Sequence, residues 1–588
     1  MFLDRRPRGD DERGWVLVWF AIMLVVLLSM AAFAVDTSLW TYDQTKQQRA
    51  ADAAALAGAV YLPGNVAKAT EVATTVATLN GYTTSTSGRI TTVDVNQVAG
   101  QPNQLQVTIT DNEDNLFGAL MGTPTSTIRK TGVATYDPPI AMGSPVNQIG
   151  NDPDITPVVT GSDRYPNLWV NVAGSDSPKA NGDAYLAGSC STSADNCSGS
   201  NSDLSSNGYY YTVHAANSGP LTLQGFDPGF VAVGDNCTYA NGNNADGSNL
   251  SAAKNLPANF NPKLPMTTAD IQARYAPVGD PSNPADPGQR YCTGDHNFAS
   301  GQGPTTTYKV FGPATIAGEP SSAPATPVCT MSFPGFTGDL APAAPGKSAP
   351  TGGLYATTAL AGAPDPLVKY FRQWYTLCTI NATAGSDYFL QITTGNGSGH
   401  NRLALRGFYG SVSNYPGTYA ANSVNIYAST RMSIYANVAS ADTTTKFHLA
   451  RLLPGSPGRT LVLDFFDIGD SPNNAVGSLQ IVPPADSGLA TFGAAGTPCT
   501  ATPPPGTSTG PPWGTPSALT NCTITGVTTS TYGGQWIEVR VPIPDTYSCT
   551  VGSPTGCWVQ IAYKFDKAIN DTTSWTAHID GDPVRIVK

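Results

Sequence analysis

Charged residues are scarce in this chain. Asp, Glu, Lys and Arg make up only 12% of its 588 residues, about half the share in an average globular domain. The formal net charge is -11, and no long basic run occurs after the first thirteen residues. A nucleic-acid interface needs clustered Lys and Arg to displace the counterions of the phosphates. The charge pattern therefore argues against a nucleic-acid partner.

The motifs of common enzymes are also missing. The sequence has no GxSxG elbow and no P-loop, and no two histidines form an HExxH pair. Glutamate is scarce after the N-terminal region, which lowers the chance of the paired carboxylates of a glycosidase, although such a pair meets only in space. We therefore expect no enzyme and no certain cofactor. The scattered histidines are His214, His296, His400, His448 and His578.

One long hydrophobic run is present near the N-terminus. Residues Trp15 to Val35 contain no charge, and at about 1.5 Å per residue they span about 32 Å, one bilayer core. Four arginines precede the run and Asp36 follows it, so the positive-inside rule predicts a cytoplasmic N-terminus, residues 1–14, and an extracellular remainder. The arginines are Arg5, Arg6, Arg8 and Arg13.

A cleaved signal peptide is the alternative for this run. Ala32-Phe33-Ala34 fits the small-x-small cleavage pattern. The run is longer than the usual apolar region of about 7–15 residues, and the helical pattern continues through Trp40 to Ala59. We favour an uncleaved single-pass transmembrane helix over residues 15–35.

An alanine-rich segment follows the run. Residues 47–59 read QQRAADAAALAGA, with small residues at a spacing of four, which lets another helix approach closely. A stalk without a partner fits the composition equally well. A second helix is predicted from Val66 to Leu79, because Pro63-Gly64 precedes it and Asn80-Gly81 stops it. Three short alternating strands complete a small α+β unit that ends near residue 137, at about 90–95, 105–110 and 128–134.

These N-terminal features resemble the TadE/TadG-like family of Flp pilus-assembly proteins, in particular its long actinobacterial members. The resemblance rests on the uncharged run, the Asp after it, the QRAADAAALAGA helix and the second helix that ends in Asn-Gly. It extends over residues 9–150 and includes FGALMG at 117–122 and Met142-Gly143-Ser144-Pro145. It implies a bacterial plasma-membrane protein that contacts other pilus-assembly or envelope proteins through the Ala-rich helix.

The sequence departs from this family at one position. Members that a prepilin peptidase cleaves carry Glu at the fifth position after the processing Gly. Here Trp19 occupies that position after Gly14. The resemblance therefore implies that the chain stays anchored and does not join a pilus shaft.

The remainder of the chain is predicted to be mainly β-structure. A linker over 138–157 precedes two copies of one domain, at 158–410 and 411–588, because three strand-like segments recur in the same order. Alternation of period two with Gly- and Pro-rich turns predicts antiparallel β-sandwiches of jelly-roll type. The matched segments begin at Leu168, Tyr209 and Leu221 in the first copy and at Met432, Lys446 and Leu461 in the second.

Aspartates in the second copy form the candidate metal site. Asp464, Asp467 and Asp470 recur at a spacing of three, and we hypothesise that Asp467 and Asp470 converge with Asp571 or Asp582 on a calcium ion, which takes six to eight oxygen ligands. Asp227 and Asp235 stand at the matching place of the first copy. The alternative is a set of Asx-turns, in which the carboxylates bond their own backbone.

Cysteine is absent from the first 189 residues, but ten occur later without a CxxC pair. In an exported chain, an even number favours disulfides. The simplest scheme joins sequence neighbours, and ten free thiols are the alternative. The predicted pairs are Cys190 with Cys197, Cys237 with Cys292, Cys329 with Cys378, Cys499 with Cys522, and Cys549 with Cys557.

Two functions fit these observations. The first is a structural membrane protein related to pilus assembly; the second is a surface protein whose sandwiches bind a glycan or an envelope component, with calcium as a brace. Several aromatic residues could form a sugar-stacking platform, but their place in alternating strands favours core packing. They are Trp169, Tyr209, Tyr211, Trp374, Trp536 and Trp558.

Overall fold

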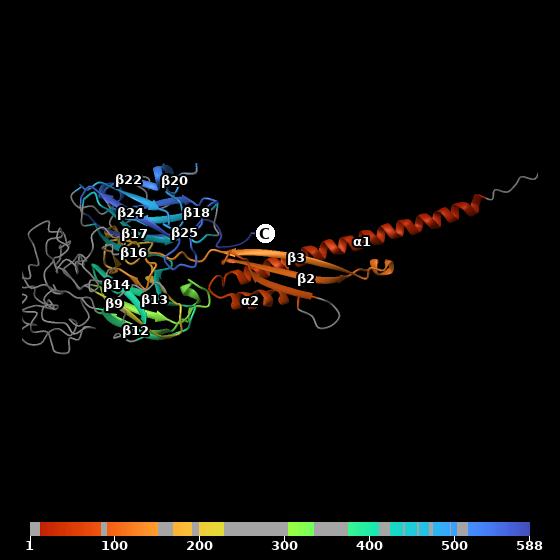
Figure 1. Ribbon diagram of the computed structural model, residues 1–588, viewed down its shortest axis with the longest axis horizontal. Helices are drawn as coiled ribbons and strands as arrows, with labels where there is room; N and C mark the ends of the chain where they lie inside the picture. The colour runs from red at the N-terminus through yellow and green to blue at the C-terminus, as the bar shows by residue number, and fades with distance from the viewer. Residues whose placement is uncertain are drawn as a thin grey trace, which may run out of the picture. The chain divides into compact units, whose positions relative to one another are not determined.

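The computed structural model describes most of the chain in two compact units (Figure 1). The first unit comprises residues 1–137 and 582–588, and the second comprises residues 138–581. The described residues are 12–83, 91–150, 168–190, 199–227, 304–333, 374–410, 424–438, 441–454, 458–469, 474–493, 496–502, 515–567 and 569–587. The chain is mainly β, with antiparallel sheets, one long N-terminal helix and short helices.

The described part of the first unit contains two α-helices, one short 3-10 helix and a four-stranded antiparallel sheet. Helix α1 (Glu12–Ala59) runs without a break through the apolar run and the Ala-rich segment. Helix α2 (Val66–Leu79) has the predicted bounds, because the Asn65 side chain accepts a hydrogen bond from Lys68 N and caps its first turn. The sheet order is β1 (Thr91–Gln97), β2 (Gln104–Asp114), β3 (Thr125–Tyr136) and β26 (Val584–Ile586).

Strand β26 places the end of the chain in the first unit. Val584 pairs with Tyr136 and Ile586 with Ala134, and the Arg585 guanidinium lies 2.5 Å from the Asp137 carboxylate. Residues Val584–Ile586, predicted to belong to the second sandwich, are therefore an edge strand of this sheet. Long-range pairing of this kind has no local signal in the sequence.

The second unit repeats one strand order. In the first half, one sheet runs β12-β9-β14-β5 and another β11-β10-β13-β8; in the second half, the orders are β23-β18-β25-β16 and β22-β19-β24-β17. If the eight strands of each half are numbered in chain order, both halves have the same two sheet orders, 6-3-8-1 and 5-4-7-2. The first-half strands are β5 (Leu168–Ala173), β8 (Tyr209–Ala215), β9 (Gly219–Phe226), β10 (Thr306–Phe311), β11 (Pro327–Phe333), β12 (Trp374–Ala382), β13 (Ser386–Thr394) and β14 (His400–Tyr409). Those of the second half are β16 (Met432–Val438), β17 (Thr444–Arg451), β18 (Thr460–Phe466), β19 (Gly477–Val482), β22 (Thr523–Val527), β23 (Trp536–Pro542), β24 (Trp558–Phe565) and β25 (Ile569–Ile579).

The two halves share one 11-stranded sheet. Strand β5 pairs with β16, with Val170 opposite Ile434 and Trp169 opposite Tyr435. Strand β15 (Val424–Ala428) pairs with β8 of the first half, although its residues fall in the predicted second domain. The predicted boundary at 410/411 therefore does not separate the sheets. Shorter strands extend them: β4 (Gln148–Ile149), β20 (Cys499–Thr502) and β21 (Ser517–Leu519).

Part of the predicted linker belongs to the core of the second unit. Ile140, Met142 and Ile149 are buried in the same cluster as the strands of both halves, and β4 pairs with β14. The apolar side chains among these residues have an aliphatic core to pack against, which explains why they do not form a free linker. Residues 151–157 lie outside the described part of the chain.

Candidate membrane-anchor site

The first half of α1 exposes its apolar side chains. Leu17 is 72% exposed and Phe33 66%, and none of the most apolar window of the helix is buried. By length and composition the helix is able to cross a membrane. The part of the chain that the structure describes contains one such helix.

Asp36, the first charged residue after the run, ties α1 to the loop between β2 and β3. Its carboxylate accepts hydrogen bonds from Leu116 N at 3.1 Å, Phe117 N at 3.2 Å and Gly118 N at 2.7 Å. These amides begin the short helix η1 (Gly118–Met121), whose N–H groups would otherwise lack partners. Asp36 is 4% exposed, so it acts as an internal cap within the unit.

Further polar side chains continue this contact along α1. The Trp40 indole donates to Asn115 Oδ1 at 2.7 Å, and Gln47 Nε2 donates to the carbonyls of Ile109 and Ile128 at 2.8 and 3.1 Å. Positions 36, 40 and 47 lie on one face of a helix because they are spaced by four and seven. That spacing is a signal in the sequence for one contact face, besides the place of Asp36 at the end of the apolar run.

The chain itself covers the Ala-rich face of α1. A Cβ at Gly58 would lie 2.4 Å from a methyl of Leu105 in β2 and 2.7 Å from the carbonyl oxygen of Ala69 in α2. The small residues therefore serve close packing of α1 on α2 and on the sheet. The helix that approaches the row closely, as the spacing predicted, is α2 of the same chain. The buried members of the row are Ala50, Ala51, Ala54, Ala55 and Ala59.

The predicted calcium ligands are only partly described. Asp467 and Asp571 are buried, and each accepts a backbone hydrogen bond, from Gly534 N at 2.5 Å and from Gly469 N at 2.8 Å. Asp470 and Asp235 lie outside the described residues, and Asp582 belongs to the first unit. Among the described residues, no group of three or more His, Cys, Asp or Glu side chains could hold a metal ion. The backbone donors to Asp467 and Asp571 lie 67 and 102 residues away in the sequence, so these two bonds are not the local bonds of Asx-turns. Asp464 accepts a hydrogen bond from the Thr576 hydroxyl at 3.1 Å.

Three of the predicted cysteine pairs form disulfides in the structure: Cys329–Cys378, Cys499–Cys522 and Cys549–Cys557. Cys190 is also disulfide-bonded. Cys197, Cys237 and Cys292 lie outside the described residues.

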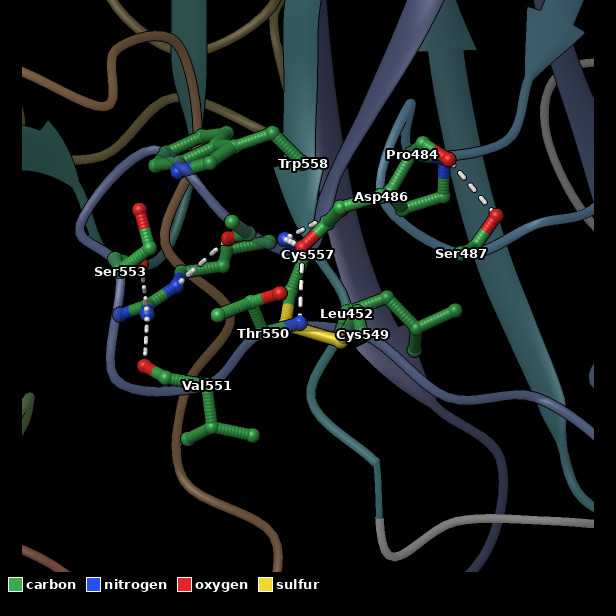
Figure 2. The surroundings of a disulfide bond; sticks show 12 residues. Leu452, Pro484, Asp486, Ser487, Cys549, Thr550, Val551, Ser553, Cys557 and Trp558 are labelled. Atoms are coloured by element: carbon green, nitrogen blue, oxygen red, sulfur yellow. Dashed lines mark hydrogen bonds between the residues drawn. A yellow bond between two sulfur atoms is a disulfide. The ribbon is translucent and has the colours of Figure 1, made fainter.

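The Cys549–Cys557 loop is held by two charged side chains besides its disulfide (Figure 2). Asp486 accepts hydrogen bonds from Thr550 N at 2.7 Å and Cys557 N at 3.2 Å. Burial pushes the pKa of Asp486 upward, but these hydrogen bonds outweigh it and hold the pKa below its usual range. Arg451 donates to the carbonyls of Val551 and Ser553.

Most of the candidate aromatic platform lies in the core. Trp169, Tyr209 and Tyr211 are fully buried, Trp374 and Trp558 are 5% and 4% exposed, and Trp536 is partly buried. Trp169 and Trp374 flank Phe226 in one cluster. These rings contribute to packing, as their place in alternating strands predicted.

Comparison with known families matches residues 14–60 to the family described as putative Flp pilus-assembly TadE/G-like. No curated protein and no solved structure gives a significant match. The matched residues begin at the apolar run and end with the Ala-rich row, and they include Asp36, Trp40 and Gln47. Residues 14–60, which form nearly all of α1, are therefore a TadE/G-like segment, as the resemblance of the sequence predicted.

Proposed function

We propose that this chain is a single-pass membrane protein with a structural role in Flp pilus assembly or cell-envelope organisation, and not an enzyme. The observation that carries the proposal is that one helix, α1, contains both the family segment and the exposed apolar run. The arginines before the run favour a cytoplasmic N-terminus and an extracellular bulk. The strand order of the second unit supports two jelly-roll sandwiches, each with two sheets of four strands.

Cell fractionation with N-terminal sequencing tests the anchor. We expect the protein in the membrane fraction with residues 1–14 retained, because α1 continues unbroken past Ala34 into the folded unit. A mature N-terminus at Val35 would support the signal-peptide alternative, and one at Trp15 would indicate prepilin processing. Protease added to intact cells should cut sites after Asp36 and leave the N-terminus protected.

Photo-crosslinking tests the link to assembly partners. Tyr42 is 66% exposed on α1, whereas Ala54 on the same helix is buried. A photoreactive residue at 42 should capture other membrane proteins of the assembly system in cells, and one at 54 should not. Equal capture at the two positions, or capture of lipid alone at 42, contradicts a partner at this face.

The alternative function is ligand binding by the second unit, with calcium as a brace. A soluble fragment for a glycan array should begin at residue 138, because Ile140 and Met142 belong to its core. For calcium, the test is the melting temperature of that fragment with calcium and with chelator. A rise with calcium that the Asp467→Asn, Asp470→Asn double variant abolishes supports a site, and an unchanged melting temperature contradicts it.

A further inference from the structure

The loop between β2 and β3 exposes large apolar side chains beside the C-terminal end of the apolar run. Leu116 is 62% exposed and Phe117 40%. Residues 115–122 read NLFGALMG and contain no charged residue. Two adjacent, exposed, large apolar side chains in an uncharged loop are a candidate contact surface.

The position of the loop relative to α1 is fixed by hydrogen bonds. The N–H groups of Leu116, Phe117 and Gly118 all donate to Asp36, which directly follows Val35, the last residue of the run. The Trp40 indole donates to Asn115 at the base of the same loop. Figure 1 shows the hairpin of β2 and β3 extending alongside α1. The loop therefore lies beside the residues of α1 that directly follow the apolar run.

Aromatic residues of α1 mark the same level. Trp40 is half-buried and Tyr42 is 66% exposed. Trp and Tyr are enriched at membrane–water interfaces, where an apolar ring body and a polar group are both satisfied. The exposed apolar side chains of the loop are thus held next to the end of the apolar run.

We propose that residues Asn115–Gly122 form a second membrane contact, in which Leu116 and Phe117 enter the outer leaflet beside α1. This inference rests on the proposed membrane anchor. A single helix leaves the attached unit free to tilt and rotate, whereas two contacts restrict both motions. The Asp36 carboxylate is covered by the loop amides, so the contact at this depth is made without an unpaired charge.

Depth-dependent fluorescence quenching in the full-length protein tests the inference. A single cysteine at Leu116, labelled with an environment-sensitive dye, is compared in phosphatidylcholine–phosphatidylglycerol vesicles with and without nitroxide-labelled lipid. The control label is at Ala99, an exposed residue in the turn at the other end of β2, about 34 Å away along the strand. The unmodified protein, labelled in the same way, gives the background from native cysteines.

We expect quenching at 116 to exceed quenching at 99 several-fold, and the Phe117→Ser change to reduce quenching at 116. Equal quenching at 116 and 99 overturns the inference. A loop that binds a protein partner instead of the membrane would give this result, because the vesicles contain only lipid. A third label at Ser29, within the apolar run, shows whether the loop contact alone fails or the proposed anchor fails as well. Quenching at 29 without quenching at 116 rejects only the loop contact, and no quenching at 29 rejects the anchor itself.

Discussion

The Asp36 carboxylate has a structural task that its place beside an apolar run does not reveal. It accepts three consecutive amides of a loop that is 80 residues away in the sequence. Replacement by Ala leaves these partly buried donors without their acceptor, and losing the acceptor of a fully buried donor typically costs about 1–3 kcal/mol, which is an upper bound here. We expect Asp36→Ala to speed hydrogen exchange of the amides at 116–118, measured in detergent micelles. The control is Asp94→Ala, on an exposed site of β1, and similar exchange in both variants would contradict the capping role.

The His214–Asp387 pair gives the second unit a pH dependence. The two side chains are 2.7 Å apart. The hydrogen bond to Asp387 raises the pKa of His214 and outweighs burial and the nearby Arg451, which lower it. The His214–Asp387 pair therefore stabilises the folded state fully below the pKa of His214 in the unfolded chain, about 6.5. This stabilisation is lost as the pH rises through the pKa of His214 in the folded protein.

The measurement is the melting temperature of His214→Gln relative to wild type. We expect the variant to lose stability at about pH 5.5 and to approach wild type at about pH 8.5. His578→Gln, at an exposed position, should show no such difference. If the melting temperature of His214→Gln falls further below wild type as the pH rises, the dependence has the opposite sign and rejects the ion pair.

Among the elements, the contact of α1 with α2 depends on one glycine. Gly→Ala in a helix normally stabilises by about 1 kcal/mol. At Gly58 the added Cβ would lie 2.7 Å from the Ala69 carbonyl and 2.9 Å from the Ala73 Cβ, and overpacking costs about 1–3 kcal/mol. We expect Gly58→Ala to destabilise the first unit in denaturant unfolding, whereas Thr45→Ala on the exposed face of α1 should be neutral. A stabilised Gly58→Ala variant would show that the helices adjust freely.

The sequence predicted elements where the determining residues are local. The bounds of α2 follow from Asn65 and from Asn80-Gly81, and the strands of the first unit lie within a few residues of their predicted positions. Contacts between distant residues were not predictable in this way. Spacing showed that the Ala row suited close packing, but not that its own chain would cover it, and β26 and β15 join sheets far from their sequence neighbours.

The disulfide before β24 is another feature that joins residues close in the sequence. The Cys549–Cys557 bond closes a short loop, and the chain-entropy model gives about 2–3 kcal/mol for its removal. We expect the Cys549→Ala, Cys557→Ala double variant to lower the denaturant midpoint of the 138–581 fragment accordingly. Asp486→Asn and Arg451→Met in that background measure what the hydrogen bonds in Figure 2 retain without the disulfide. A double variant as stable as wild type would mean that these hydrogen bonds suffice.

At the scale of the molecule, the two copies of the repeat form one body. The repeat itself was visible in the sequence, because matched segments became β5 and β16, β8 and β17, and β9 and β18. What joins the copies was not visible. Besides the β5–β16 pairing, buried polar contacts cross between them: Arg402 of β14 donates to Thr572 of β25 at 3.0 Å and lies 3.9 Å from the centre of the Tyr435 ring.

The predicted division at 410/411 can therefore be tested directly. A 138–410 fragment exposes the β5 edge, leaves the 4% exposed Arg402 without Thr572 and Tyr435, and lacks the β15 strand that covers β8. Breaking a buried charged contact by removing its partners typically costs about 3–5 kcal/mol. We expect 138–410 and 411–581 each to melt well below the intact 138–581 fragment, and to regain its melting temperature when refolded together. If 138–410 alone melts with the intact fragment, the copies are independent domains, and the shared sheet contributes little to their stability.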